Sequence, residues 1–414
     1  MNDVLRITAR DVAGDGGDSD QSGRFDRFKL IGWWDQPRLS RARVLVCGAG
    51  ALGNEIIKNL ALLGVGNLFI ADMDRVENSN LSRSVLFRES DNGAFKATAA
   101  ARGAKAIYPD IKVQHFNGNI VHDLGLGVFR WADVIIGGLD NREARLSINR
   151  SCWKVNRPWI DGAIESIDGS ARVFVPDGPC YECTMSQQDW KLLQMRRSCN
   201  LLSRPEMEAG GKTPTTPTVS SIIAGVQCQE AVKLLHGMPT LAGGAFVFNG
   251  VTNDSYITQF QRKDDCYSHD ILEEIVTLDE GVDTITPREL LSRAQAMLGP
   301  KAELELAREV LEKLICPTCK SEEQIFASLG KVSGDKVWCP RCDKVRREVV
   351  TFHKIRGHES FIDRPLAEIG VPAFDVILAR SAAGEGRSVG FELAGDAANV
   401  LGELLSSDEA LELV

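Results

Sequence analysis

Residues 43–74, RVLVCGAGALGNEIIKNLALLGVGNLFIADMD, carry the pattern that decides the fold. An apolar run at Arg43–Cys47 leads into a glycine-rich stretch, Gly48–Gly53, which opens an apolar helical pattern. Two further glycines end that helix, and Asn67–Asp72 is the second predicted strand. Strand, glycine turn, helix and strand in this order are typical of one unit of a parallel sheet with helices on both faces.

The same alternation of strand and helix continues downstream. Helices are predicted near 93–107 and 141–155, and strands near 112–116 and 133–136. We therefore expect an α/β chain with a doubly wound, Rossmann-like and mostly parallel sheet, followed by a smaller α+β region.

Composition divides the chain into four expected segments. Residues 1–23 are rich in Gly, Asp and Ser and are expected to be a mobile N-terminal segment. The α/β domain is expected at 24–270. Two helical patterns at 284–315 and four clustered cysteines define a segment at 271–345, and a short mixed α/β tail follows at 346–414.

Overall composition excludes several classes of function. The 414 residues are 43% apolar and 25% charged, which is ordinary for a globular protein. The formal net charge of −9 argues against nucleic acid or an anionic membrane as a partner, because both favour clustered positive charge. No apolar run approaches the roughly 18 residues of a membrane helix, and the first residues lack the apolar core of a signal peptide. A cytoplasmic enzyme is expected.

The glycine turn predicts a site for phosphates. Its residues Gly48, Ala49, Gly50 and Gly53 let the backbone approach a ligand closely, and the free N–H groups at a helix start favour negative charge. Asp72, at the end of the next strand, is placed to accept hydrogen bonds from ribose hydroxyls. This pattern alone also fits an NAD-dependent oxidoreductase, so the turn does not decide between ATP and a dinucleotide.

Neighbouring polar residues favour ATP with magnesium. Asp74, Asn80, Arg83 and Lys96 follow the second strand, and Asp140-Asn141 follows a later one. Hydride transfer has no need for such cations at this edge, whereas ATP requires cations for its triphosphate and a carboxylate for Mg²⁺. Structural explanations stay open for single residues, with Asn80 and Arg83 supporting a loop and Asp140 acting as a helix N-cap.

Six motifs in order resemble the adenylation domain of the ThiF/MoeB superfamily, which is shared by ubiquitin-activating enzymes and the bacterial sulfur-carrier activators of thiamine and molybdopterin synthesis. The motifs are Arg24-Phe-Asp-Arg27, Gly48–Gly53, Ile70-Ala-Asp72-Met-Asp74, Ser79-Asn80-Leu-Ser-Arg83, Lys96 and Leu139-Asp140-Asn141. The family usually has a second glycine where this sequence has Ala51, a departure that is tolerable if residue 51 is helical.

The resemblance implies a role for each matching residue. Asp72 would hold the ribose. Asn80, Arg83 and Lys96 would bind the phosphates. Asp140 would coordinate Mg²⁺, and Asp74 and Asn141 lie beside these residues in the sequence.

Arg27 resembles the arginine finger of the family, which reaches the phosphates from the partner half of a dimer. Because this chain has one such domain, the resemblance implies a homodimer. The alternative is that Arg24 and Arg27, beside two phenylalanines, belong to a plain amphipathic helix.

Cys199 is the expected thiol nucleophile. Cys47, Cys152 and Cys228 lie in apolar elements and are expected in the core, whereas Cys199 follows two arginines, which favour the reactive thiolate. The resemblance places the thioester cysteine of ubiquitin-type enzymes in a crossover segment, here 186–218. Sulfur-carrier activators also have a cysteine in this region, so Cys199 alone does not establish a thioester, and an exposed thiol without function stays an alternative.

Two groups of cysteines predict structural zinc sites. The first is a zinc ribbon of four thiolates, Cys316, Cys319, Cys339 and Cys342. The second pairs a C-x-x-C with a later C-x-x-H and consists of Cys180, Cys183, Cys266 and His269. For the second group the alternative is loss of the metal, which would leave His269 as a surface residue.

In the tail, residues 365–380 resemble the end of a β-grasp module, which in eukaryotic activating enzymes recruits the conjugating enzyme. The alternative is an accessory domain for oligomerisation or partner binding.

Taken together, the sequence predicts an enzyme that adenylates the C-terminal glycine of a ubiquitin-like protein with ATP and Mg²⁺. It would then form a thioester on Cys199 and pass it to a conjugating enzyme. Three other functions stay open: a sulfur-carrier adenylyltransferase, a non-catalytic scaffold half of an activating complex, and an oxidoreductase.

Overall fold

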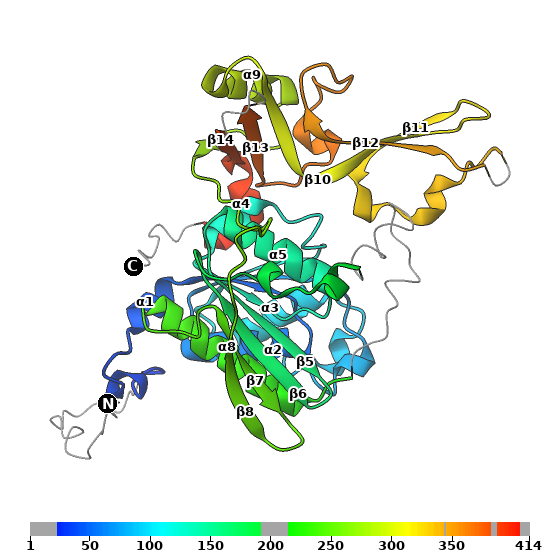
Figure 1. Cartoon of the computed structure of the whole chain (residues 1–414). Helices are drawn as coiled ribbons and strands as arrows, with labels where there is room; N and C mark the ends of the chain where they lie inside the picture. Colours follow the sequence, from blue (N-terminus) through cyan, green and yellow to red (C-terminus); the bar gives the residue numbers. More distant parts are fainter. Residues whose placement is uncertain (1–22, 192–213, 343–344, 382–386, 406–414) are drawn as a thin grey trace.

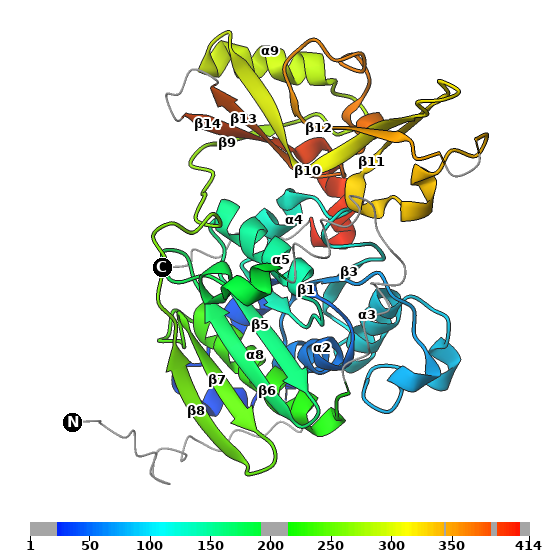
Figure 2. The ribbon, with the colours of Figure 1, turned by 45° about the vertical axis from the view of Figure 1, so that its right-hand side comes forward.

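The computed structural model describes residues 23–191, 214–342, 345–381 and 387–405, within which two β-sheets form (Figures 1 and 2). The first sheet has eight strands in the order β3-β2-β1-β4-β5-β6-β7-β8. Its strands are β1 (Arg43–Cys47), β2 (Asn67–Ala71), β3 (Lys112–Phe116), β4 (Val134–Gly137), β5 (Trp159–Glu165), β6 (Asp168–Phe174), β7 (Gly244–Asn249) and β8 (Asp254–Gln259). From β3 to β5 all pairs are parallel, and β6, β7 and β8 continue the sheet antiparallel.

Helices cover both faces of the first sheet, and its central strands β1 and β2 are accordingly apolar after their first residues. Val44 and Val46 of β1 face a cluster built with α2 (Ala51–Leu63), α3 (Lys96–Ile107) and α8 (Pro217–Leu235). The alternate residues Leu45 and Cys47 face a second cluster with α4 (Leu126–Trp131) and α5 (Arg142–Lys154). The expected doubly wound, mostly parallel fold is therefore confirmed. Among the described helices, which also include α1 (Gln36–Arg41), none combines the length and apolar character that crossing a membrane requires.

The second sheet has six strands, in the order β11-β10-β13-β14-β9 with β12 also paired to β10. Its strands are β9 (Ile275–Leu278), β10 (Ala302–Ile315), β11 (Glu322–Ser328), β12 (Glu348–Ile355), β13 (Val376–Ser381) and β14 (Ser388–Leu393). Helix α9 (Pro287–Leu298) starts with a Thr286–Glu289 capping box and connects β9 to β10. The segments expected at 271–345 and 346–414 thus both contribute strands to one sheet.

The second of the two helical patterns expected at 284–315 is wrong. Residues 302–315, AELELAREVLEKLI, form the 14-residue strand β10 although Ala, Glu, Leu and Lys favour helix. This strand pairs with β11, β12 and β13, and it buries Leu304, Val310, Leu311 and Leu314. Pairing on both edges and burial outweigh local propensity here, because propensity is worth only tenths of a kcal/mol per residue, about 0–0.7.

The C-terminal residues complete the second face of the first sheet. Leu401 in α10 (Ala397–Leu401) and Leu404 are buried in the same cluster as Phe69 of β2 and Phe129 of α4. Figures 1 and 2 show this red segment between the second sheet and α4. The approach is close, because a side chain on Gly125 would lie 2.4 Å from the carbonyl oxygen of Phe374. One hydrophobic cluster therefore contains residues of both sheets, including Val376 and Leu378 of β13.

Side chains also join the two parts across this contact. The carboxylate of Asp375 accepts from the backbone N of Leu126 at 2.7 Å, and Arg308 pairs with Asp375 at 3.3 Å. Arg308 also donates to the carbonyl of Leu124 at 2.7 Å. Since these groups are buried or half-buried, each bond removes a polar group that would otherwise be unpaired.

Both predicted zinc-ligand groups come together in space, each with its four ligand atoms within 4.8 Å of one another. In the first group, Cys180 Sγ lies 3.7 Å from Cys183 Sγ and 3.5 Å from Cys266 Sγ, and His269 Nε2 lies 3.4 Å from Cys183 Sγ. Four ligands at roughly 2.3 Å from a tetrahedral zinc are about 3.8 Å apart, so the spacing fits the metal.

The second group lies at one end of the long hairpin of the second sheet. Ile315 of β10 pairs with Glu322 of β11 and Glu348 of β12, so both knuckles fall at the same end of these strands. There Cys319 Sγ lies 3.8 Å from Cys339 Sγ. Four thiolates with no open position suit a structural metal rather than a catalytic one.

We expect about two zinc ions per purified chain, one for each group. Metal analysis should show that Cys183→Ser and Cys319→Ser each remove about one of them, because zinc does not hold a tetrahedral site with three ligands as tightly. The control is Cys228→Ser, which changes a buried thiol outside both groups and should leave the zinc content unchanged. Zinc that persists in full in either ligand variant would contradict the assignment.

Candidate active site

The glycine turn between β1 and α2 is built by close backbone packing. Gly48 has φ +96°, a left-handed conformation that favours glycine. A side chain on Gly53 would lie 2.0 Å from the carbonyl oxygen of Gly48, so this position tolerates no Cβ. Ala51 is the first residue of α2, so its methyl group is compatible with the turn as expected. The turn thus presents the N-terminus of a 13-residue helix at the carboxyl end of β1.

Asp72 holds this turn to the next strand. Its carboxylate accepts from the backbone N of Ala49 at 2.7 Å and from that of Asp74 at 2.8 Å. Burial raises the pKa of the Asp72 carboxyl group, against the lowering effects of Lys96 and of these two hydrogen bonds. Each carboxylate oxygen has a second lone pair, so the same group can also accept from a ligand hydroxyl.

Lys96 lies beside the turn and is paired. Its ammonium group is 2.8 Å from Asp74 Oδ2, and its backbone N donates to the Asp74 carbonyl at 2.9 Å. The Lys96 side chain is 13% exposed, whereas that of Asp74 is 56% exposed. An anion at the turn would therefore compete with an exposed carboxylate for a cation that the fold already holds in place.

Asn80 and Arg83 lie in the loop that follows. Asn80 Oδ1 accepts from the backbone N of Glu77 at 3.0 Å, and Arg83 Nη1 donates to the carbonyl of Ser79 at 2.8 Å. Both side chains therefore support the loop locally, as the structural explanation proposed. These bonds use one part of each side chain, and guanidinium has five N–H donors in all.

Asp140 lies next to the turn at the end of β4. Gly138 packs directly on the glycine turn, since a Cβ atom on Gly138 would lie 2.9 Å from the backbone N of Gly53. The side chain that caps α5 is that of Asn141, which accepts from the backbone N of Ala144 at 2.8 Å, so the N-cap explanation for Asp140 is wrong. Asp140 itself is exposed. An exposed carboxylate is a ligand that Mg²⁺ accepts, with water and phosphate oxygens as the others.

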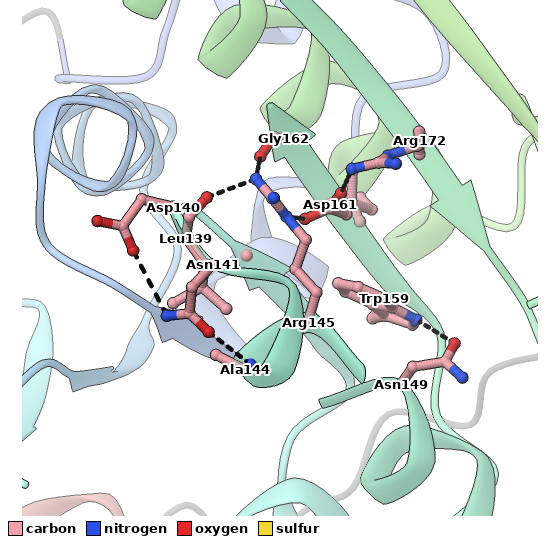
Figure 3. A network of polar contacts seen from close by, with 12 residues as sticks. Leu139, Asp140, Asn141, Ala144, Arg145, Asn149, Trp159, Asp161, Gly162 and Arg172 are labelled. Atoms are coloured by element: carbon pink, nitrogen blue, oxygen red, sulfur yellow. Dashed lines mark hydrogen bonds and ion pairs between the residues drawn. The ribbon is translucent and has the colours of Figure 1, made fainter. Parts of the chain in front are cut away.

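A buried arginine, which the sequence analysis missed, holds the backbone before Asp140. Arg145 donates to the carbonyls of Leu139 and Gly162 and to Asp161 Oδ1 at 3.0 Å, as Figure 3 shows. Asp161 is fully buried and also pairs with Arg172. Burial lowers the pKa of Arg145, but the combined effects of Asp161, Tyr181 and Asp140 outweigh it and the pKa is raised. The only sequence signal was an arginine one turn into a helix after Asp140-Asn141.

Arg27 lies near the amino ends of the strands, whereas this site lies at their carboxyl ends. Its neighbour Arg24 donates to the carbonyl of Ile107 at the end of α3, and Phe25 packs against Gly64 at the end of α2. Because the glycine turn and Lys96 lie at the starts of those helices, about 20 Å separates Arg27 from the turn along the 13 residues of α2. The structure does not bring Arg27 to the site of its own chain.

The expected core cysteines Cys47, Cys152 and Cys228 are all buried, which confirms the prediction. Burial raises the pKa of the Cys228 thiol to about 12, so it is not a nucleophile at neutral pH. Cys199 lies outside the described residues, as does most of the crossover segment 186–218.

Comparisons with known proteins identify the family. The model of the ThiF family matches residues 24–268. The SAMP-activating enzyme E1 of Haloferax volcanii is 32% identical over 263 residues, which are 60% of this chain and 89% of that protein. The sulfur carrier protein adenylyltransferase of Thermus thermophilus is 35% identical over 234 residues, which are 53% of this chain and 79% of that protein.

A solved structure has a similar fold. It is that of E. coli MccB with ATP, with a TM-score of 0.51 and 21% identity, covering 61% of this chain and 75% of MccB. The family model spans more than half of the chain, and the two relatives are matched over most of their own length. The chain belongs to the ThiF family.

Proposed function

We propose that this chain activates the C-terminal glycine of a ubiquitin-like protein with ATP and Mg²⁺ in the cytoplasm, and then carries it as a thioester on Cys199 for transfer to a conjugating enzyme. Adenylation follows from the family: the relatives matched over most of their length are named as an activating enzyme and an adenylyltransferase. The chain is therefore an adenylyltransferase that acts on a ubiquitin-like or sulfur-carrier protein. The choice of the first, and the thioester, are the proposal.

One observation carries the proposal: Lys96, Asp72 and Asp140, which come from three separate segments, are linked to the glycine turn or follow a residue that packs on it. The Asp74–Lys96 pair reaches the turn through Asp72, and Asp140 follows Gly138, which packs on Gly53. An anionic triphosphate with a bound divalent cation needs both kinds of group at close quarters. A nicotinamide dinucleotide would use the glycine turn and Asp72 but leave the remaining charges without a role.

The proposed reaction needs no general base, because the substrate carboxylate is ionised at neutral pH. A carboxylate oxygen attacks the α-phosphorus of ATP and forms the acyl–phosphate bond. The bond from the α-phosphorus to the bridging oxygen breaks, and pyrophosphate leaves with that electron pair. Catalysis then consists of positioning the two reactants and stabilising the charge that develops on the phosphates.

The residues at the turn would supply that stabilisation. Arg83 and Lys96 bind the phosphates, and the N–H groups at the start of α2 add positive potential. Lys96 exchanges its ion pair with Asp74 for one with the nucleotide. Magnesium, held by Asp140, would neutralise charge on the leaving pyrophosphate, and Asn141 keeps that strand end fixed as the cap of α5.

In the second step the Cys199 thiolate attacks the carbonyl carbon of the acyl-adenylate. The carbon–oxygen bond to AMP breaks, AMP leaves, and a thioester forms. The region from about residue 271 onward, which contains the second sheet, is the proposed platform for the conjugating enzyme.

Arg27 is proposed to act in trans. Its neighbours Arg24 and Phe25 pack at the ends of α3 and α2 that are remote from the glycine turn, which supports a role in another copy of the chain. A two-fold homodimer places the same residue of each subunit at the site of the other.

Sulfur-carrier activation is the second candidate. The 35% identity to the sulfur carrier protein adenylyltransferase supports this candidate. The similarity to the activating enzyme supports the first candidate equally strongly. Both functions share adenylation and differ in what happens to the adenylate.

Asp140→Ala should reduce ATP–pyrophosphate exchange at least about 100-fold, because the metal-bound charge on the phosphates is lost. The assay uses the full chain, Mg²⁺ and a carrier protein that ends in glycine. Asp110→Ala is the control, since Asp110 is an exposed acid beyond the end of α3, and it should keep wild-type exchange. Exchange that survives in the Asp140 variant would refute the magnesium assignment.

Cys199→Ala should retain exchange within about twofold but form no covalent complex with the carrier, because the nucleophile acts only after the adenylate has formed. Non-reducing gels with and without a thiol reductant detect the complex. Cys228→Ala should form it normally. A wild-type chain that makes adenylate but no reductant-sensitive complex would exclude the thioester and leave the sulfur-carrier function.

Arg27→Ala and Asp140→Ala should each be inactive alone, yet an equal mixture after subunit exchange should recover about a quarter of wild-type exchange. The recovery arises because half of the dimers then contain one site with both residues intact. No recovery, with mixed dimers verified by mass, would show that Arg27 does not act across the dimer.

A further inference from the structure

Asn54 is a fully buried polar side chain in the first turn of α2, and nothing in the reaction above uses it. A buried amide is stable only when its donors and acceptor are paired, so its partners indicate its role. The Asn54 amide nitrogen donates to the carbonyl of Ala49 at 2.7 Å and to that of Gly50 at 3.1 Å. Its amide oxygen accepts from the backbone N of Leu86 at 2.9 Å.

These three bonds join two separate segments of the candidate site. Ala49 and Gly50 form the glycine turn, whereas Leu86 follows three residues after Arg83 in the next loop. Leu86 is itself buried and packs against Gly103 of α3, the helix that begins with Lys96. Asn54 is therefore a direct polar link between the turn and the loop that carries Arg83.

Asn54 also fixes the direction in which the carbonyl groups of the turn point. By binding the carbonyls of Ala49 and Gly50, the amide nitrogen of Asn54 keeps these oxygens on the inner side of the turn. Carbonyl oxygens on the ligand side would repel phosphate. Asparagine suits this position because its short, uncharged side chain carries both an NH₂ donor and a carbonyl acceptor.

We propose that Asn54 is a positioning residue that fixes the Arg83 loop relative to the glycine turn, so that Arg83 meets the outer phosphates of a nucleotide whose α-phosphate lies on the turn. The inference rests on the proposed function, because it assumes a triphosphate at this turn. It predicts a specific defect: affinity for the outer phosphates falls, whereas affinity for the adenosine and α-phosphate is kept.

The test compares ATP with AMP on the full chain in the presence of Mg²⁺, by competition against a fluorescent nucleotide. For Asn54→Leu we expect the ratio of ATP to AMP affinity to fall at least about tenfold, since misplacement by about 1 Å is known to cost up to about 100-fold in activity. Asn67→Leu is the matched control. Asn67 is equally buried and donates to the carbonyls of Arg41 and Ala42, but at the amino edge of the sheet. Its ratio should stay within about twofold of wild type.

Asn54→Ser guards against a variant that simply fails to fold. Its hydroxyl can still bond the carbonyl one turn back in α2, but it is one bond too short to reach Leu86. We expect this variant to stay folded, with an unfolding temperature lowered only by the loss of the Leu86 bond, and to show the same selective loss of ATP affinity.

A double-mutant cycle separates positioning from general damage. If Asn54 acts through the Arg83 loop, Asn54→Leu with Arg83→Ala should bind ATP no more weakly than Arg83→Ala alone. Additive losses, equal losses of ATP and AMP, or unchanged ATP affinity in both Asn54 variants would overturn the inference. Failure of the wild-type chain to prefer ATP to AMP would instead refute the phosphate site of the proposed function.

Discussion

Close packing of backbone on backbone at the carboxyl ends of β1 and β4 is the constraint on which the rest of the site depends. Gly53 has no room for a side chain against the Gly48 carbonyl, and Gly138 has almost none against Gly53. Because β1 and β4 are parallel neighbours, their carboxyl ends meet at one edge of the sheet. The packing brings Asp140 to the start of α2, where the helix N-terminus already favours negative charge.

Two polar tethers then attach the remaining groups to this packed backbone. Asp72 joins the turn to the Asp74–Lys96 pair, and Asn54 joins it to the loop of Arg83. Both tethers are buried, so their hydrogen bonds are not in competition with water. Lys96 and the loop that carries Arg83 are thus linked to the turn without any ligand, and such preorganisation is what electrostatic stabilisation of a reacting phosphate would require.

Sequence reasoning predicted what depends on local pattern. The strand at Arg43–Cys47, the helix that ends at Leu63 and the zinc-ligand groups all follow from residue spacing, and the structure has them. It failed for β10, whose helix-favouring residues are overruled by partners far along the chain. Asn54 and Arg145 were missed for the same reason, because a single polar residue in a helix reveals its partners only after the strands have assembled. Likewise, no pattern in the sequence indicated that Leu401 and Leu404 cover the first sheet.

The most direct test of the account is the identity of the nucleotide products. The full chain, incubated with ATP labelled in the α- and γ-phosphates, Mg²⁺ and a carrier protein ending in glycine, should release AMP and pyrophosphate in equal amounts, and neither without the carrier. Carrier-dependent ADP and phosphate would place the scission one bond further out. Tight binding of a nicotinamide dinucleotide with no turnover of ATP would show that the charges around the glycine turn serve another ligand.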